Sequence, residues 1–361
     1  MLTEELSQRV FHDAVVGSLI GLAVGDALGL PYEGLSKNRQ RKLVKNADSY
    51  QFLFGRGMVS DDTDHACMVA QSVIVSGCDP DVFINSLSWR LRFWILGLPA
   101  GIGMATLRGA IRLWFGRTWR TSGVWSGGNG PSMRGPLLGV LFARDPERCR
   151  AFVHRSTILT HTDPKAEIAA MAIAVAARLA YLEGGEVTAT RYIAIVREEI
   201  GSNDEGFFEI LEGLGVSLES SESTEVYAEK LGLGTGVTGY SFHTVPVVLH
   251  AWLSCPTDYS MAIKTVIRCG GDTDTSAAIL GGIIGATVGE RGIPALWRAR
   301  IVEWPCTLAW VKRLGIECAD SATSKKERSA IHFNVLGQLL RNLLFLLVVL
   351  CHGFRRLLPP Y

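Results

Sequence analysis

Two short stretches far apart in the chain combine aspartates with hydroxyl side chains, Ser60-Asp61-Asp62-Thr63 and Asp272-Thr273-Asp274-Thr275. Each stands directly before an apolar run of residues. Carboxylates crowded this closely repel one another, and a divalent cation is one of the few partners that cancels the repulsion. The side-chain atoms on offer are oxygens, without the Cys or His spacing of a zinc site, which favours magnesium or manganese. We therefore predict one hard-cation site built from both stretches.

Each stretch also has a simpler interpretation, as the acidic first turn of a helix. There the helix dipole and the free backbone N–H groups favour negative charge in any case. For either stretch alone this interpretation is the commoner one. The matched context of the two stretches favours the metal site.

The first apolar segment, residues 3–29, has the spacing of a long helix and carries glycine every four residues, at Gly17, Gly21, Gly25 and Gly29. A spacing of four keeps these glycines near one face of the helix. Because such a face weakens a helix, we expect another helix or a ligand to approach it closely. Asp26 lies among the glycines, and Glu33 follows in a loop beside the end of this helix.

A second apolar stripe starts at Asp62 and ends at Gly77, which places Asp61 and Asp62 on the first turn of a helix. A later helix is opened by the capping pair Asp163-Pro164. His161 stands just outside that helix, where a packing or capping role is more common than a site role.

Residues 127–134 form a glycine-rich loop, Gly-Gly-Asn-Gly-Pro-Ser-Met-Arg. Consecutive glycines allow backbone N–H groups to converge on an anion, and Arg134 could add positive charge. The loop lacks the final Lys-Ser or Lys-Thr of a P-loop, so a plain turn is an equal alternative.

Alanine, glycine and leucine dominate the chain and alternating strand patterns are rare, which predicts an all-α fold in a single compact multi-helix domain over residues 1–320. Residues 201–230 turn polar, and we expect them to form an exposed excursion. Residues 265–269 are one short strand-like run. Residues 234–239 match G-x-G-x-x-G, but no strand precedes them and Pro246 should break the following helix, so we reject a dinucleotide site.

Composition excludes few classes of function, because the net charge is +1. The eight cysteines are scattered without a C-x-x-C pair, which predicts reduced thiols in a cytoplasmic protein. The N-terminus, with Glu4 and Glu5, does not resemble a signal peptide. Tryptophans between residues 89 and 125 could stack on nucleic-acid bases, but the nearby arginines form no basic run. Core packing is favoured, and no sequence-specific nucleic acid is expected as a partner.

Residues 321–361 differ from the rest as a basic and apolar tail with its own helix. The uninterrupted apolar run 343–351 is shorter than the roughly 20 residues that cross a bilayer. A helix on a membrane surface, or a marginal membrane anchor, is weighed equally with a helix that packs on the body or a partner. All site motifs precede residue 276, so removal of the tail is predicted to leave the reaction nearly intact.

Several motifs in a fixed order resemble the ADP-ribosylglycohydrolase family over about residues 8–300: Gly25–Glu33, Ser60–Thr63, Gly128–Gly130 with Met133-Arg134, Thr160-His161, Gly239–Pro246 and Gly270–Thr275. The resemblance implies an all-helical fold with a binuclear magnesium or manganese centre. It also implies cleavage of the bond between ADP-ribose C1″ and a protein side chain or other acceptor. The expected substrate is therefore an ADP-ribosylated protein or a small-molecule conjugate of ADP-ribose.

Carried over residue by residue, the resemblance places the metals at Ser60, Asp61, Asp62, Asp272, Asp274 and Thr275. It places the substrate at Gly128, Asn129, Gly130, Ser132, Met133, Arg134 and His161. Glu33 would lie beside the ribose, and Glu33 and Asp62 are both candidates for the base, because the reaction develops oxocarbenium character and needs a positioned water. Ser60 stands where threonine is common, and Pro131-Ser132 stands where small residues are usual.

Two rival functions remain at this point. The strand-like run before Asp272 could carry the aspartate pair of a magnesium-dependent phosphatase, which would require an α/β sheet. A family member without catalysis could keep the fold as a binding or structural protein. The intact carboxylates of both stretches argue against the second rival.

Overall fold

The computed structural model describes residues 2–43, 49–52, 55–201, 204–332 and 334–355. In this part of the chain the only β pairing consists of isolated bridges, so the all-α prediction is confirmed. The α-helices are α1 (Leu2–Gly29), α2 (Lys37–Leu43), α3 (Asp61–Ser76), α4 (Pro80–Trp94), α5 (Met104–Trp114), α6 (Trp119–Ser122), α7 (Gly135–Leu141), α8 (Pro146–Ile158), α9 (Pro164–Glu183), α10 (Ala189–Ile200), α11 (Glu205–Glu219), α12 (Thr224–Lys230), α13 (Ser241–Ser254), α14 (Tyr259–Arg268), α15 (Thr273–Gly292), α16 (Ala295–Arg300), α17 (Leu308–Ser324) and α18 (Val335–Arg355). Short 3₁₀ turns are η1 (Leu30–Tyr32), η2 (Ile95–Gly97), η3 (Ser132–Arg134) and η4 (Gly184–Glu186).

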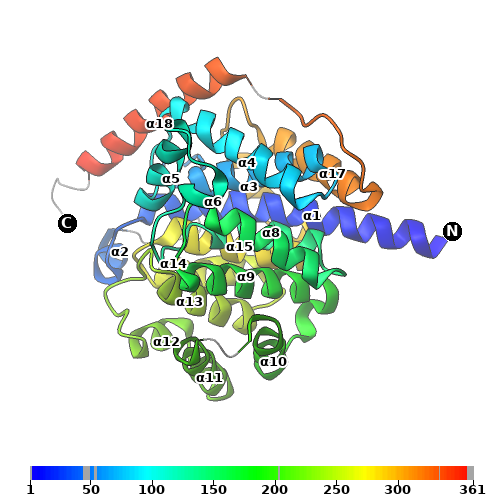
Figure 1. The fold of residues 1–361 in the computed structure, drawn as a ribbon. Coiled ribbons are helices and arrows are strands. Elements are labelled where there is room, and N and C mark those ends of the chain that lie inside the picture. The colour runs from blue at the N-terminus through cyan, green and yellow to red at the C-terminus, as the bar shows by residue number, and fades with distance from the viewer. Residues whose placement is uncertain (1, 44–48, 53–54, 202–203, 333, 356–361) are drawn as a thin grey trace.

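The centre of the fold is an antiparallel pair formed by α1 and α15 (Figure 1). The glycine face of α1 lies directly against this partner, as the four-residue spacing predicts. A Cβ atom added to Gly21 would stand 2.2 Å from the carbonyl oxygen of Gly281, and one added to Gly25 would stand 2.1 Å from that of Ala277. The same register brings Gly29 against Thr273, so the end of α1 meets the start of α15.

We expect Gly21→Ala to destabilise the protein by about 3 kcal/mol or more, because the added methyl would force two packed backbones apart. Gly213→Ala is the matched control, since a Cβ there meets nothing within 4 Å on α11. That substitution should stabilise the protein by about 0.5–1 kcal/mol, the usual gain of alanine over glycine inside a helix. Urea denaturation of both variants measures the difference, and equal midpoints would contradict the packing described here.

The remaining helices cover the central pair from two sides. Helices α3 and α17 pack on α1, while α9, α13 and α14 pack on α15. Helices α10, α11 and α12 lie beyond α9 and α13, at the bottom of Figure 1, and α18 lies across the top. The large buried cluster that links these helices is made mostly of Ala, Val, Leu and Ile side chains.

Two expectations about local structure are wrong. The run at residues 265–269 lies at the end of α14, a helix whose N-cap Asp258 accepts a hydrogen bond from the Met261 amide. The premise of the phosphatase alternative, a strand in a sheet, is therefore absent from the described residues. Residues 205–230 form α11 and α12 with many exposed side chains, which agrees with the expected exposed excursion. Pro246 lies inside α13 and does not break it.

Candidate active site

The first aspartate stretch forms the start of α3, with Ser60 as its N-cap. The Ser60 amide donates to the carboxylate of Asp26, at 2.9 Å from Oδ2. Thr63 donates to the same carboxylate from both its amide, at 3.2 Å, and its hydroxyl, at 2.6 Å. Asp26 on α1 thus accepts hydrogen bonds from free N–H groups at the N-terminal end of α3. These bonds fix the direction in which the side chains of Asp61 and Asp62 point away from the helix.

The second aspartate stretch follows a turn at Gly270 and Gly271, whose φ angles are +74° and +81°. A Cβ on Gly271 would stand 1.9 Å from the Val237 carbonyl oxygen, so only glycine fits. Two loops hold this turn through backbone hydrogen bonds. The Gly34 amide donates to the Gly271 carbonyl at 2.8 Å, and the Asp272 amide donates to the Val237 carbonyl at 2.9 Å. Glu33, which precedes Gly34, is held beside the start of α15 by this contact.

The two stretches meet where the Thr275 hydroxyl donates to Asp62 Oδ2 at 3.1 Å. Beside this contact lies a cavity of about 500 Å³. Most of the site residues expected from the sequence line it, namely Glu33, Asp61, Gly128, Asn129, Gly130, Met133, His161, Asp272, Asp274 and Thr275. The structure therefore gathers into one place residues that are up to 242 positions apart, from Glu33 to Thr275.

The glycine-rich loop packs around the His161 imidazole. A Cβ on Gly128 would stand 3.0 Å from Nε2 of His161, and one on Gly130 would stand 3.1 Å from its Cε1. Between them Asn129 donates from its side-chain amide to Asp272 Oδ2 at 2.7 Å and to the Thr244 hydroxyl at 2.9 Å. Asn129 therefore ties the loop to the second aspartate stretch.

Four expected site residues do not line the cavity: Ser60, Asp62, Ser132 and Arg134. All are buried. Arg134 donates to the Ser156 carbonyl and, at 2.8 Å, to the Thr160 hydroxyl, and that hydroxyl is 2.9 Å from His161 Nδ1. Arg134 therefore fixes His161 indirectly, through the Thr160 hydroxyl. The amides of Asn129 and Ser132 donate to carbonyls within the protein, so they are not directed at the cavity.

Burial dominates the electrostatics of the site. It raises the pKa of Asp62 well above its usual value, and the charges of Asp26, Asp61 and Asp272 raise it further. The pKa of Asp274 is raised by burial and then by Glu33 and Asp272. Burial and the Arg134 charge lower the pKa of His161 to about 3, so its imidazole is neutral at pH 7.

The donor atoms fit a hard divalent cation. Asp62 Oδ1 and Asp274 Oδ1 are buried and have no hydrogen-bond partner, which is costly unless a cation or water satisfies them. The nearby hydroxyls of Ser60 and Thr275 add neutral oxygen donors. As the side chains of the described residues stand, no three carboxylate, imidazole or thiol groups converge as a preformed metal cage.

Sequence reasoning did not assign a role to Asp26 or to the loop at residues 237–239. The signal for Asp26 is that it is the only charged residue in the apolar stretch of residues 14–30. Val237, Thr238 and Gly239 line the cavity within the rejected G-x-G-x-x-G segment. Their contact with Gly271 joins residues far apart in sequence, which no local pattern reveals.

The fold is shared with known proteins. A solved structure of an ADP-ribosylglycohydrolase-related protein complex shares the fold, with a TM-score of 0.63, 23% identity, and coverage of 87% of this chain and 99% of that one. An uncharacterized protein of Archaeoglobus fulgidus is 30% identical over 287 residues, covering 77% of this chain and 88% of the relative.

Two relatives with named activities are more distant in sequence. The ADP-ribosyl-[dinitrogen reductase] glycohydrolase of Rhodospirillum rubrum is 25% identical, covering 80% of this chain and 90% of the relative. ADP-ribosylhydrolase ARH3 of Xenopus tropicalis is 25% identical, covering 82% and 93%. The family model described as ADP-ribosylglycohydrolase matches residues 7–324. This chain belongs to the ADP-ribosylglycohydrolase family.

Proposed function

We propose that this protein is a divalent-cation-dependent hydrolase that removes ADP-ribose from a modified protein side chain or from another acceptor. Family membership supports glycosidic hydrolysis of ADP-ribose conjugates. The observation that carries the proposal is the single cavity that collects both aspartate stretches, Glu33, His161 and the glycine-rich loop.

The charge of the cavity supports a cation requirement. Among the described residues that line it, none is Lys or Arg, and His161 is neutral at pH 7. Aspartates and Glu33 leave the walls negative, whereas the diphosphate of ADP-ribose is an anion. A bound cation would remove this mismatch.

Magnesium or manganese would be held by Ser60, Asp61, Asp62, Asp272, Asp274 and Thr275. Bound there, the cation would supply Lewis-acid orientation of ribose oxygens and of a water. The protein groups act around that centre. Asn129 keeps Asp272 in place through its 2.7 Å hydrogen bond, and Thr275 keeps Asp62 in place.

Glu33 is the better placed of the two candidate bases. It lines the cavity and is exposed to it, whereas Asp62 is buried and does not line it. A negative carboxylate near C1″ also favours the positive charge that develops there as the bond breaks. We therefore assign the proton abstraction from water to Glu33, and the holding of the cation to Asp62. Neutral His161 contributes a packing surface and one ring nitrogen to the bound ADP-ribose.

The test is incubation of the protein with ADP-ribosylated arginine, ADP-ribosylated serine and small-molecule conjugates, each with magnesium, with manganese and with chelator. Release of ADP-ribose from at least one conjugate, abolished by chelator, is expected. Cation binding without release from any conjugate would favour the non-catalytic alternative. Release that survives chelation would remove the cation from the proposal.

We further propose that the protein acts at a membrane surface, on the cytoplasmic side. Helix α18 has its apolar side chains outward, at Leu336, Leu340, Leu343, Leu344, Leu347, Leu350 and Phe354. Its polar side chains Gln338, Arg341 and Asn342 are buried against the body. This inverts the usual pattern of a surface helix, and it suits a helix whose outer face meets lipid.

The charges around α18 suit an anionic lipid surface. Arg355 is exposed at the end of α18, Lys325 and Lys326 are exposed on the segment that leads from α17 to α18, and no acidic residue follows Glu327. Arg328 pairs with Asp320 at 3.5 Å, and Arg356 lies outside the described residues.

By length and composition, residues 336–355 could also cross a bilayer. The buried ion pair of Arg341 with Glu303 favours a helix that stays on the body and touches the membrane with one face. Two other segments pass the same criteria, Leu6–Tyr32, whose apolar window of 18 residues is wholly buried, and Pro164–Glu186, whose window is mostly buried.

The full-length protein should sediment with vesicles rich in phosphatidylserine more than with neutral vesicles. Each exposed Lys or Arg near the surface contributes about 1 kcal/mol, and added salt should weaken the preference. Leu340→Glu with Leu347→Glu should abolish sedimentation, because both side chains lie on the outer stripe. Leu296→Glu is the control, since Leu296 is equally exposed on α16. If the protein ignores all vesicles and instead dimerises through the same two leucines, the membrane proposal is wrong.

A further inference from the structure

The inner face of α18 packs against backbone that leads into the candidate active site. Gln338, Arg341 and Asn342 are at most 8% exposed, and Asn342 donates to the Gly97 carbonyl at 2.7 Å. The family model ends at residue 324, whereas α18 begins at Val335. These contacts therefore come from a part of the chain that the family match does not cover.

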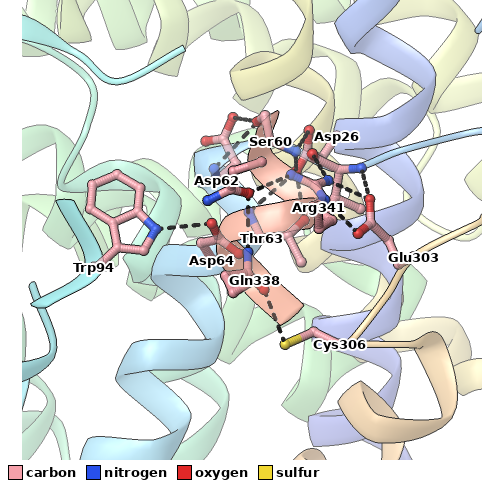
Figure 2. Close-up of polar contacts among 12 residues, drawn as sticks. Asp26, Ser60, Asp62, Thr63, Asp64, Trp94, Glu303, Cys306, Gln338 and Arg341 are labelled. Atoms are coloured by element: carbon pink, nitrogen blue, oxygen red, sulfur yellow. Dashed lines mark hydrogen bonds and ion pairs between the residues drawn. The ribbon is translucent and has the colours of Figure 1, made fainter. Parts of the chain in front are cut away.

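Arg341 and Glu303, which lie side by side in Figure 2, together satisfy both backbone polar groups of Val59. The Val59 amide donates to Glu303 Oε1 at 2.7 Å, and the Val59 carbonyl accepts from the Arg341 guanidinium at 2.6 Å. Arg341 also donates from Nε to Glu303 Oε2 at 2.9 Å. Both side chains of the ion pair are only 5% exposed, so the arrangement is fixed by desolvated, charge-assisted hydrogen bonds.

Val59 is the residue directly before the N-cap of α3. Its neighbour Ser60 donates from its amide to Asp26, so the backbone that leads into Asp61 and Asp62 is fixed at two consecutive residues. Figure 2 shows Asp26, Ser60, Glu303 and Arg341 converging on this short stretch. Loss of the hydrogen bonds that Val59 makes with Arg341 and Glu303 would therefore move the first aspartate stretch relative to the second.

The same helix reaches the Glu33 side of the site. His352 Nε2 lies 3.1 Å from the Pro31 carbonyl oxygen, two residues before Glu33. Phe345 packs in a small buried cluster with Leu30 and Met58. One helix thus contacts the backbone just before Glu33 and the backbone just before Ser60.

We propose that α18 is a positioning element of the active site, and that Arg341 is its main positioning residue. Through Val59 it sets the placement of Asp61 and Asp62 needed to bind the cation. The inference rests on the proposed function only in taking these carboxylates as cation ligands. It differs from the expectation that the tail is dispensable for the reaction.

The test is manganese affinity of the full chain, measured by titration with detection of free Mn²⁺, alongside melting temperature, kcat and KM. Arg341→Met alone would leave the Glu303 carboxylate buried without its partner. The variant therefore combines Arg341→Met with Glu303→Met, because apolar replacement of both members of a buried ion pair often preserves folding. The double variant should bind manganese on the order of 10–100-fold more weakly, as loss of outer-shell support usually does.

The matched control is Arg178→Met with Glu199→Met, a second buried ion pair with side chains 6% and 11% exposed, outside the cavity lining. Its melting temperature should change as much as that of the first pair, with manganese affinity unaltered. Arg341→Lys provides a second variant that keeps the charge but not the planar fork that reaches both Glu303 and Val59. It should bind manganese more weakly than wild type and more tightly than the double variant.

Wild-type protein that binds no manganese would defeat the proposed cation site itself. Wild-type binding together with unchanged affinity in the double variant would overturn the role of α18 and leave the cation site standing. Should the double variant not fold, unchanged affinity in Arg341→Lys overturns the inference by itself.

Discussion

Replacement of Asp274 by asparagine should remove cation binding and hydrolysis together while the protein stays folded. Asp274 is buried, lines the cavity, and has one carboxylate oxygen without a partner. The amide keeps the shape of the side chain but not the charge that a hard cation requires. We expect a loss of activity of at least about 10²-fold, the scale for a group that stabilises charge in the reaction.

The same substitution should stabilise the cation-free protein above neutral pH. Burial and the charges of Glu33 and Asp272 raise the pKa of Asp274 well above its usual value. A group whose pKa is raised by folding stabilises the folded state while it is protonated, and that stability is lost as the pH rises through the folded-state pKa. At pH 8 the wild type must either bury this carboxylate as an anion or keep it protonated above its usual pKa, and both states cost free energy. Asparagine is neutral and avoids both costs.

Isothermal titration with magnesium or manganese and thermal melting without cation measure both effects. Asp61→Asn should behave in the same way, because Asp61 also lines the cavity and has a raised pKa. Glu209→Gln on the exposed face of α11 controls for loss of one negative charge and should change neither binding nor melting. Undiminished binding in both aspartate variants would rule out the assignment of the cation to these stretches.

Features with a local signature could be predicted from the sequence. Caps such as Gly77 and Asp163 mark helix ends because they suit the backbone conformation or satisfy free backbone groups there, and both lie where the patterns place them. The glycine spacing of α1 predicts a closely packed face. It could not reveal that α15 is the partner, because the matching residues Gly281 and Gly285 lie more than 250 positions away.

Features decided by tertiary packing could not be predicted. The β-branched run at residues 265–269 is too short to show a helical period, and burial of Val266 and Ile267 against neighbouring helices decides for α14. Pro246 lies beyond the first turn of α13 and is buried, so tertiary packing holds the helix although proline removes one of its backbone hydrogen bonds. The polar side of α18, with Gln338, Arg341 and Asn342, is apparent from the sequence, but the surface on which it packs is not. Nothing in the sequence near Arg341 indicates that its partner is Glu303.

Glu33→Gln should lower turnover far more than it lowers cation affinity. The residue lies in the loop after η1 and lines the cavity. Its negative charge is close enough to raise the pKa of both Asp61 and Asp274, after the larger effect of burial. The loop is fixed by the hydrogen bond from Gly34 to Gly271, so the substitution should change the chemistry of one side chain without moving the loop.

Positioned acid or base groups contribute on the order of 10²–10⁴ in rate, and this is the expected fall in kcat for Glu33→Gln at saturating cation. Manganese affinity should stay within about threefold of wild type. Loss of a residue that supports the metal ligands usually weakens affinity by about 10-fold or more. Glu33→Asp keeps the charge but withdraws it by one methylene, so it should retain more activity than the amide. The opposite pattern, weak cation binding with kcat nearly intact at saturation, would make Glu33 a cation ligand. The base would then have to be the other candidate, Asp62.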